Sequence, residues 1–211
     1  MNSLGLFLDF DGTLADSLDV MRNVYSRFLS DHGARPTDEE FDRLNGPPLN
    51  VIVADMKETH QLQDDVPTLR NRYLTAVRRG LADAPPAPGA GELLAAVHGR
   101  NWTVGVVTSS DRRLVDDWLD RTGLRPFVAE VVGGGDVARG KPDPEPYRVM
   151  LARTGCDPER SWAIEDSRKG AQSSLSAGLR TAVVAARANR ENWPAGVHFI
   201  SDLRDMLARI D

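Results

Sequence analysis

The chain has 211 residues, a formal net charge of −5 and a pI of about 5.4, which suits one sizeable hydrophobic core with a modest insertion. The acidic balance offers no positive field for DNA or RNA, and no run of about 18 apolar residues is present, so neither a nucleic-acid partner nor a membrane span is expected. Cys156 is the only cysteine, which fits a reducing compartment, and we expect a cytoplasmic protein without an obligate protein partner.

Short apolar segments recur along the chain and predict the strands of a buried sheet. The first is residues 4–10, and the others are residues 102–107, 128–132, 161–164, 181–185 and 198–200. Helical patterns lie between most of them, and two of these end in a Thr-Gly pair, which is typical of helix termini. The alternation predicts an α/β fold, a Rossmann-like parallel sheet with helices on both faces. Ligands bind such sheets outside the carboxyl ends of the strands.

One stretch breaks the alternation, because its patterns are helical only. It begins after the first strand and returns through a segment rich in proline, alanine and glycine, residues 81–91, that suits a hinge. Thr37 and Glu40 have the spacing of a capping box at the start of one of these helices. We predict a core domain of residues 1–14 and 87–211, with a small helical cap domain, residues 15–86, inserted after the first strand.

Two aspartates end the first strand, in the segment Asp9-Phe10-Asp11-Gly12-Thr13. Residues two apart on a strand point to the same side, so the two carboxylates converge and repel each other unless a cation lies between them. A turn formed by Asp-Gly alone is the structural alternative. The position of the pair at the end of a buried strand favours a site.

Hydroxyl groups follow the second strand as Thr108, Ser109 and Ser110, before Asp111 at the head of a helix. Hydroxyls and backbone N–H groups at a helix N-terminus can hold phosphate oxygens. The same residue types are also the ordinary helix N-caps. This motif is therefore informative only together with the others.

A lysine, Lys141, follows a glycine-rich turn and stands among three prolines in the segment GKPDPEPY. A lysine fixed in this way could contact a phosphate and screen nearby aspartates, whereas most lysines lie on the surface. Glu165 and Asp166 end the fourth strand, and paired carboxylates there suit Mg²⁺, which prefers oxygen ligands. Helix capping by Asp166 or Ser167 is the alternative.

In this order, the motifs DFDGTLADS, TSS, KPDPEPY and EDS resemble those of the haloacid dehalogenase superfamily, in the branch with a small helical cap that includes phosphoglycolate phosphatases and β-phosphoglucomutases. The resemblance covers essentially the whole chain. It implies a Mg²⁺-dependent phosphatase in which Asp9 is the nucleophile and Asp11 the general acid and base. It also implies that Thr108 and Lys141 hold the phosphoryl oxygens, with the backbone around Gly12 and Ser109.

The resemblance further implies that the metal is bound by Asp9, the Asp11 backbone carbonyl and Asp166, with Glu165 close by. In the cap, Arg43, Asn45 and Gly46 are predicted to contact the substrate, although a purely structural role is equally open. The substrate is expected to be a small phosphorylated metabolite, either a phosphoglycolate-like acid or a sugar or polyol phosphate. A sugar-phosphate mutase of the β-phosphoglucomutase type and a catalytically silent phosphoryl-binding protein are the alternatives.

Overall fold

The fold was analysed in a computed structural model, which describes residues 3–44, 47, 49–184 and 191–210. The chain forms two compact units. One comprises Met1–Asp16 together with Pro85–Asp211, and the other is Ser17–Ala84. We call them the core unit and the helical unit. Whether the helical unit works as a cap stays a prediction. Within the described residues, no helix is long and apolar enough to cross a membrane.

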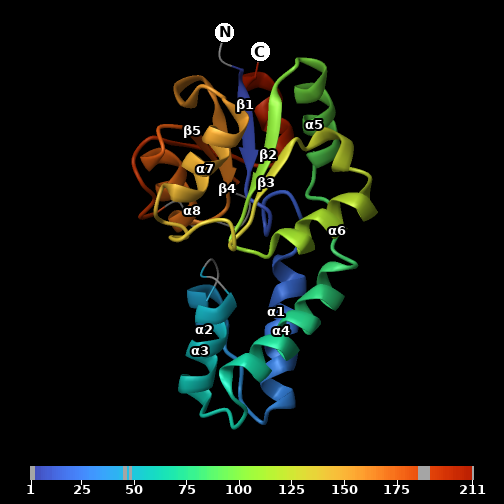
Figure 1. Ribbon diagram of the computed structural model, residues 1–211, viewed down its shortest axis with the longest axis vertical. Helices are drawn as coiled ribbons and strands as arrows, with labels where there is room; N and C mark the ends of the chain where they lie inside the picture. Colours follow the sequence, from blue (N-terminus) through green and yellow to red (C-terminus); the bar gives the residue numbers. More distant parts are fainter. Residues whose placement is uncertain (1–2, 45–46, 48, 185–190, 211) are drawn as a thin grey trace. The chain divides into compact units, whose positions relative to one another are not determined.

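The core unit contains a six-stranded sheet in the order β3-β2-β1-β4-β5-β6, in which all neighbouring strands are parallel (Figure 1). The strands are β1 (Gly5–Leu8), β2 (Thr103–Val107), β3 (Glu130–Val132), β4 (Trp162–Glu165), β5 (Arg180–Val184) and β6 (Val197–Ile200). β1 is buried along its whole length, as expected for a central strand covered on both faces. The predicted fold class is confirmed.

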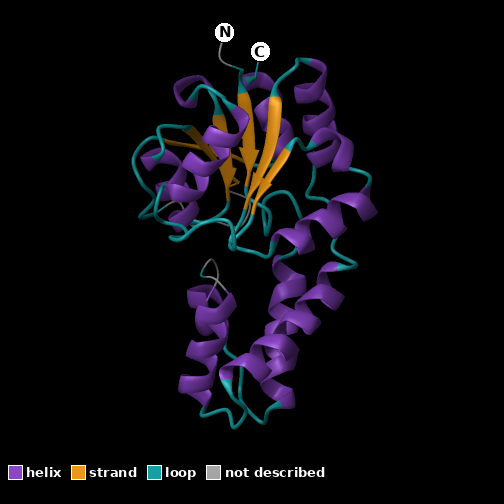
Figure 2. Cartoon of the chain, viewed as in Figure 1, coloured by secondary structure: helices purple, strands orange, loops and turns teal. Residues whose placement is uncertain are grey.

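Helices connect the strands and cover both faces of the sheet (Figure 2). They are α5 (Ala90–Gly99), α6 (Arg112–Thr122), α7 (Glu145–Thr154) and α8 (Arg168–Ser176), with short 3-10 helices η1 (Arg125–Phe127), η2 (Pro158–Arg160) and η4 (Leu203–Arg209). With this strand order, right-handed crossovers place α5 and α6 on one face and α7 and α8 on the other. Gly123 and Gly155, with φ of 72° and 66°, end α6 and α7 at the predicted Thr-Gly pairs.

The register of the sheet brings the ends of three strands together. Leu8 of β1 lies beside Val106 of β2 and Ile164 of β4. The residues that follow these positions therefore leave the same edge of the sheet, next to one another. The backbone N–H of Asp9 still donates to the carbonyl of Ile164 at 2.9 Å, which fixes the start of the turn after β1.

The helical unit consists of α1 (Leu18–Asp31), α2 (Asp38–Leu44), α3 (Leu49–His60) and α4 (Val66–Leu81). α4 packs against both α1 and α3, and the rings of Phe28 and Tyr73 meet edge to face with centroids 4.9 Å apart. The helix α3 was not predicted as a separate element. Its buried face contains only Val53 and Met56, and Val51 is 48% exposed, so its apolar pattern is weak.

A buried carboxylate, Glu40, joins three helices of this unit. Its Oε2 accepts a hydrogen bond from the hydroxyl of Tyr25 at 2.6 Å and lies 2.8 Å from His60 Nε2, and Arg43 lies 3.7 Å from Oε1. Thr37 Oγ1 accepts from the Glu40 N–H at 3.2 Å, which is one half of the predicted capping box. The glutamate side chain does not complete the box because it points to Tyr25 and His60 instead.

Candidate active site

Charged and hydroxylated side chains gather at the carboxyl ends of β1, β2 and β4. Four of them are buried, although their side chains are polar: Asp9, Thr108, Lys141 and Glu165. Asp11 and Asp166 are half-buried beside them. Buried charges are costly unless they are paired, so the contacts among these groups define the site.

Lys141 is the centre of these contacts. Its Nζ lies 2.6 Å from Asp9 Oδ1 and 2.5 Å from Glu165 Oε1, and it donates to the backbone carbonyl of Val107 at 2.9 Å. Burial acts to lower the pKa of Lys141, but the carboxylates of Asp9 and Glu165 outweigh it and hold the pKa above its ordinary value. Lys141 is therefore a buried cation, which excludes the alternative of a surface lysine.

Glu165 is fully buried, and several side chains form hydrogen bonds or ion pairs with its carboxylate. Besides Lys141, the hydroxyl of Tyr147 donates to Glu165 Oε1 at 2.6 Å, and Ser167 Oγ lies 3.4 Å from Oε2. A side chain at Gly170 would collide with the Glu165 carboxylate, so only glycine fits there. Burial raises the pKa of Glu165 to about 7, because the stabilising charge of Lys141 is opposed by that of Asp9.

Asp9, Glu165 and Asp166 form an acidic cluster in which one ligand atom from each lies within 4.8 Å of the others. Burial of its carboxyl group, followed by the charges of Asp9 and Glu165, raises the pKa of Asp166 well above its ordinary value. Three converging carboxylates repel one another, and a hard divalent cation relieves that repulsion. The all-oxygen donor set therefore fits Mg²⁺.

Asp11 is oriented by the second strand. Ser110 Oγ donates to Asp11 Oδ2 at 2.8 Å, and the Ser110 N–H donates to Thr108 Oγ1 at 3.0 Å. Gly12 has a φ of 81°, and its N–H donates to the carbonyl of Ala15 at 3.0 Å. The Asp-Gly pair thus forms a tight turn as well as contributing to the site, and the Gly12 N–H is used inside that turn.

The structure brings most of the predicted core residues together. Asp9, Lys141, Glu165 and Asp166 cluster as described, and Ser110 links Thr108 to Asp11.

Of the three residues predicted to contact the substrate from the cap, the structure describes only Arg43. Arg43 in α2 forms two hydrogen bonds, of 2.7 and 2.6 Å, to Asp55 in α3 of its own unit. Asn45 and Gly46 lie outside the described residues. The predicted contacts of all three with a substrate therefore stay predictions.

Three residues of the site were not predicted in the roles that the structure gives them. Ser110 follows the second strand, as Thr108 does, so a strand-end search could have assigned it to Asp11. Tyr147 lies inside α7 and Gly170 inside α8, where each has the pattern of an ordinary helical residue. Nothing local signals that a glutamate 18 positions from Tyr147 accepts its hydrogen bond.

The chain is similar to known proteins over nearly its whole length. A family model described as haloacid dehalogenase-like hydrolase matches residues 6–184. The chain is 28% identical to N-acetylmuramic acid 6-phosphate phosphatase of Pseudomonas aeruginosa, covering 100% of this chain and 96% of the relative. It is 25% identical to the pyrophosphatase PpaX of Oceanobacillus iheyensis, over 96% of this chain and 94% of that one. Both relatives are named as phosphatases, which confirms the predicted enzyme class.

Among solved structures, the chain resembles a mutant of CbbY from Rhodobacter sphaeroides in complex with xylulose-(1,5)bisphosphate. The TM-score is 0.86 at 23% identity, and the match covers 99% of each chain. At this identity the likeness supports the fold alone.

Proposed function

This chain belongs to the haloacid dehalogenase-like hydrolases, and from that membership we propose that it hydrolyses a small phosphate monoester through a phosphorylated intermediate on Asp9. The observation that carries the proposal is the contact of buried Lys141 with Asp9 on one side and Glu165 on the other. A cation held against the nucleophile balances the negative charge of that carboxylate. It also offers positive charge where phosphoryl oxygens would lie.

The chemistry proposed for the two aspartates is what the family resemblance implies, and their surroundings support it. Asp9 Oδ attacks phosphorus, the bond to the leaving oxygen breaks, and Asp11 gives that oxygen a proton. Asp11 then takes a proton from the water that cleaves the acyl phosphate, which returns both carboxylates to their starting state. The hydrogen bond from Ser110 holds Asp11 in one orientation for both proton transfers. Thr108 lies at the neighbouring strand end to bind a phosphoryl oxygen.

We propose Mg²⁺ as the cofactor, held by Asp9, Asp166 and the backbone carbonyl of Asp11, with Glu165 beside them. When bound, the cation neutralises charge on the phosphoryl group and on the converging carboxylates. The acidic cluster supports this assignment, because without a cation two of its members carry pKa values raised by burial and mutual repulsion.

For the substrate we propose a phosphoglycolate-like acid or a sugar or polyol phosphate. The name of the Pseudomonas aeruginosa relative specifies the phosphate ester of a sugar acid, which combines both chemical features. The name of the Oceanobacillus iheyensis relative specifies pyrophosphate, which therefore belongs in any test panel.

The test is release of phosphate from a panel of sugar phosphates, phosphoglycolate and pyrophosphate, with and without Mg²⁺. We expect Mg²⁺-dependent release by the wild type and its loss in Asp9→Asn, which keeps the shape of the side chain but not its nucleophilic charge. Interconversion of hexose 1- and 6-phosphates without release would support a mutase instead. Absence of both reactions in a protein that binds Mg²⁺ would support the silent phosphoryl-binding alternative.

A further inference from the structure

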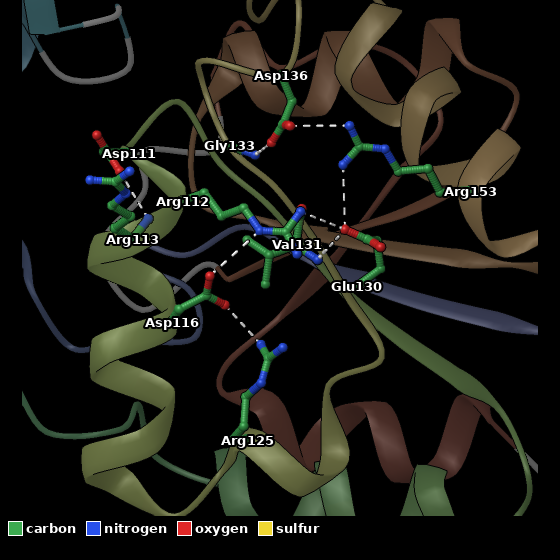
Figure 3. Close-up of polar contacts among 10 residues, drawn as sticks. All are labelled: Asp111, Arg112, Arg113, Asp116, Arg125, Glu130, Val131, Gly133, Asp136 and Arg153. Carbon is green, nitrogen blue, oxygen red and sulfur yellow. Dashed lines mark hydrogen bonds and ion pairs between the residues drawn. The ribbon is translucent and has the colours of Figure 1, made fainter.

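A chain of alternating charges lies along the edge strand β3, outside the acidic cluster (Figure 3). Arg112, the first residue of α6, donates to Glu130 Oε1 and to the backbone carbonyl of Val131, both at 2.9 Å. Arg153, in the last turn of α7, contacts the same Glu130 oxygen at 3.3 Å and Asp136 Oδ1 at 3.1 Å. The chain thus joins α6, β3 and α7.

Asp136 ends this chain on a backbone turn. Its second oxygen, Oδ2, accepts a hydrogen bond from the N–H of Gly133 at 2.8 Å, which closes residues 133–136 into a compact turn. Burial acts to raise the pKa of Asp136, but the hydrogen bond from Gly133, followed by the contacts and charges of Arg153 and Arg112, lowers it below its ordinary value. Asp136 is therefore an ionised acceptor held between Arg153 and the turn.

The turn at residues 133–136 contacts the backbone that follows β2. The Gly134 N–H donates to the carbonyl of Ser110 at 2.9 Å. A side chain on Gly134 would collide with the Ser109 carbonyl oxygen, and the Cβ of one on Gly133 would lie 2.8 Å from the backbone nitrogen of Arg112. Gly133 and Gly134, in the run for which the sequence indicated only a turn, are needed so that two backbones can approach this closely.

The contact between Gly134 and Ser110 is linked directly to Asp11, the proposed general acid and base. Ser110, whose carbonyl is held by Gly134, donates its hydroxyl to Asp11 and its N–H to Thr108. Each contact in the series is short and directional: Arg153 to Asp136, Asp136 to Gly133, Gly134 to Ser110, and Ser110 to Asp11. A displacement of the turn would therefore displace the hydroxyl that orients Asp11.

We propose that Asp136 is a positioning residue, which places Ser110 and through it Asp11 by fixing the turn at residues 133–136. This inference rests on the proposed function, because its catalytic consequence requires Asp11 to transfer protons during phosphate-ester hydrolysis. The placement itself is independent of that function. Misplacing a catalytic group by a fraction of an ångström affects the rate of the chemical step more than substrate binding.

The chain of charges supplies its own control. Arg125 in η1 pairs with Asp116 in α6 at 2.8 Å, with side chains 39% and 34% exposed. Arg153 and Asp136 are comparable, at 34% and 23% exposed. Asp116 also lies 3.5 Å from Arg112, so Arg125→Gln removes a similar ion pair at the other end of the same network, one that does not touch the turn (Figure 3). It controls for any general loss of stability.

The experiment uses the full chain with Mg²⁺ and measures two quantities in wild type, Asp136→Ala, Asp136→Asn and Arg125→Gln. The first is kcat and KM for the best ester of the panel, and the second is hydrogen exchange of the Gly134 amide. In Asp136→Ala we expect kcat to fall about tenfold with KM within about twofold, and Gly134 to exchange at least about tenfold faster. In Asp136→Asn, whose amide oxygen can still accept from Gly133, kcat and the exchange rate of the Gly134 amide should both be close to those of the wild type. Arg125→Gln should change neither.

Each other result counts against the proposal. Faster exchange with unchanged kcat would show that the turn does not position the site, and a lower kcat with unchanged exchange would refute the route through Gly134. If Asp136→Ala does not fold, Asp136→Leu replaces it, since it keeps the approximate size of the side chain and removes the acceptor for Gly133. A wild type without turnover would contradict the proposed function, and Gly134 exchange would still decide whether Asp136 fixes the turn.

Discussion

Each unit of the molecule buries a glutamate that accepts a hydrogen bond from a buried tyrosine, and the two arrangements are closely matched. In the core unit, Tyr147 donates to Glu165 at 2.6 Å, and in the helical unit Tyr25 donates to Glu40 at the same distance. Each glutamate also contacts a basic side chain, Lys141 at 2.5 Å in the core unit and His60 at 2.8 Å in the helical unit.

The surroundings of the two glutamates differ. Glu165 ends a parallel strand, where Asp9 and Asp166 converge on it. In the part of the chain that the structure describes, these three residues form the only cluster of His, Cys, Asp or Glu side chains placed to hold a metal ion. Glu40 instead joins three helices. A buried tyrosine–glutamate pair is thus a structural element, and a reactive site requires the additional carboxylates that parallel strand ends bring together.

The strongest way to break the comparison is to remove one lysine from each unit. Lys141→Met should lower turnover by at least about 10²- to 10³-fold, because it removes the cation beside Asp9 and leaves buried carboxylates without it. Lys57, in the last turn of α3 in the helical unit, donates to the carbonyls of Leu62 and Asp64, beyond the end of that helix, at 2.6 and 2.8 Å. Lys57→Met should cost about 1 kcal/mol of stability and leave kcat unchanged.

Both lysine variants are measured by phosphate release and by urea denaturation. Comparable loss of turnover in the two would contradict the separation between a reactive core unit and a structurally stabilised helical unit.

The two tyrosines provide a closer match. Tyr147→Phe and Tyr25→Phe each delete one hydroxyl that donates to a buried carboxylate, so each should lower the free energy of unfolding by roughly 1 to 3 kcal/mol. Only Tyr147→Phe should also lower kcat, by about tenfold, because Glu165 would no longer be held against Lys141. Denaturation of both variants and steady-state kinetics at saturating Mg²⁺ test this. Equal kcat values in the two variants would show that Tyr147 is purely structural.

The site also shows which of its residues could be predicted from the sequence and which could not. Asp9, Asp11, Glu165 and Asp166 were predicted because they stand where apolar segments end, and the topology of a parallel sheet brings such ends together. Lys141 was predicted because it follows a glycine-rich turn and is closely followed by prolines. Tyr147 was not assigned a role, because a contact between helix α7 and strand β4 leaves no periodic or local mark. Helix α3 was missed for a related reason: few of its residues are buried, so its pattern is faint.

Alkaline pH tests Tyr25 of the helical unit, and a comparison with Tyr25→Phe separates its effect from that of Tyr147, whose pKa is also raised by burial. Burial and the hydrogen bond to Glu40 raise the pKa of Tyr25 to about 12, whereas an unfolded tyrosine titrates near 10. The folded state therefore binds this proton more tightly. The resulting stability, roughly 3 kcal/mol, should be complete below pH 10 and be lost as the pH rises through 12. Tyr25→Phe should lose stability less steeply over this range in urea denaturation between pH 9 and 12. An unchanged slope would contradict this assignment.

The smallest expected effect concerns Arg43, and it decides between the two roles left open for this residue. Arg43→Gln removes both hydrogen bonds to Asp55, whereas Asp55→Asn weakens the pair but keeps the guanidinium. Because the Arg43 side chain is 53% exposed, either change should shift the denaturation midpoint only slightly, and less so at high salt.

If the pair serves only to join α2 to α3, the two variants will have the same KM for every ester of the panel. If Arg43 contacts the leaving group, Arg43→Gln will raise KM for anionic substrates while Asp55→Asn lowers it or leaves it unchanged, because the guanidinium is then released from its partner. We expect the first result, since the guanidinium already has two short hydrogen bonds within its own unit. A raised KM in Arg43→Gln would instead show that the helical unit contributes to substrate binding, so that the core unit and the helical unit would differ less in function.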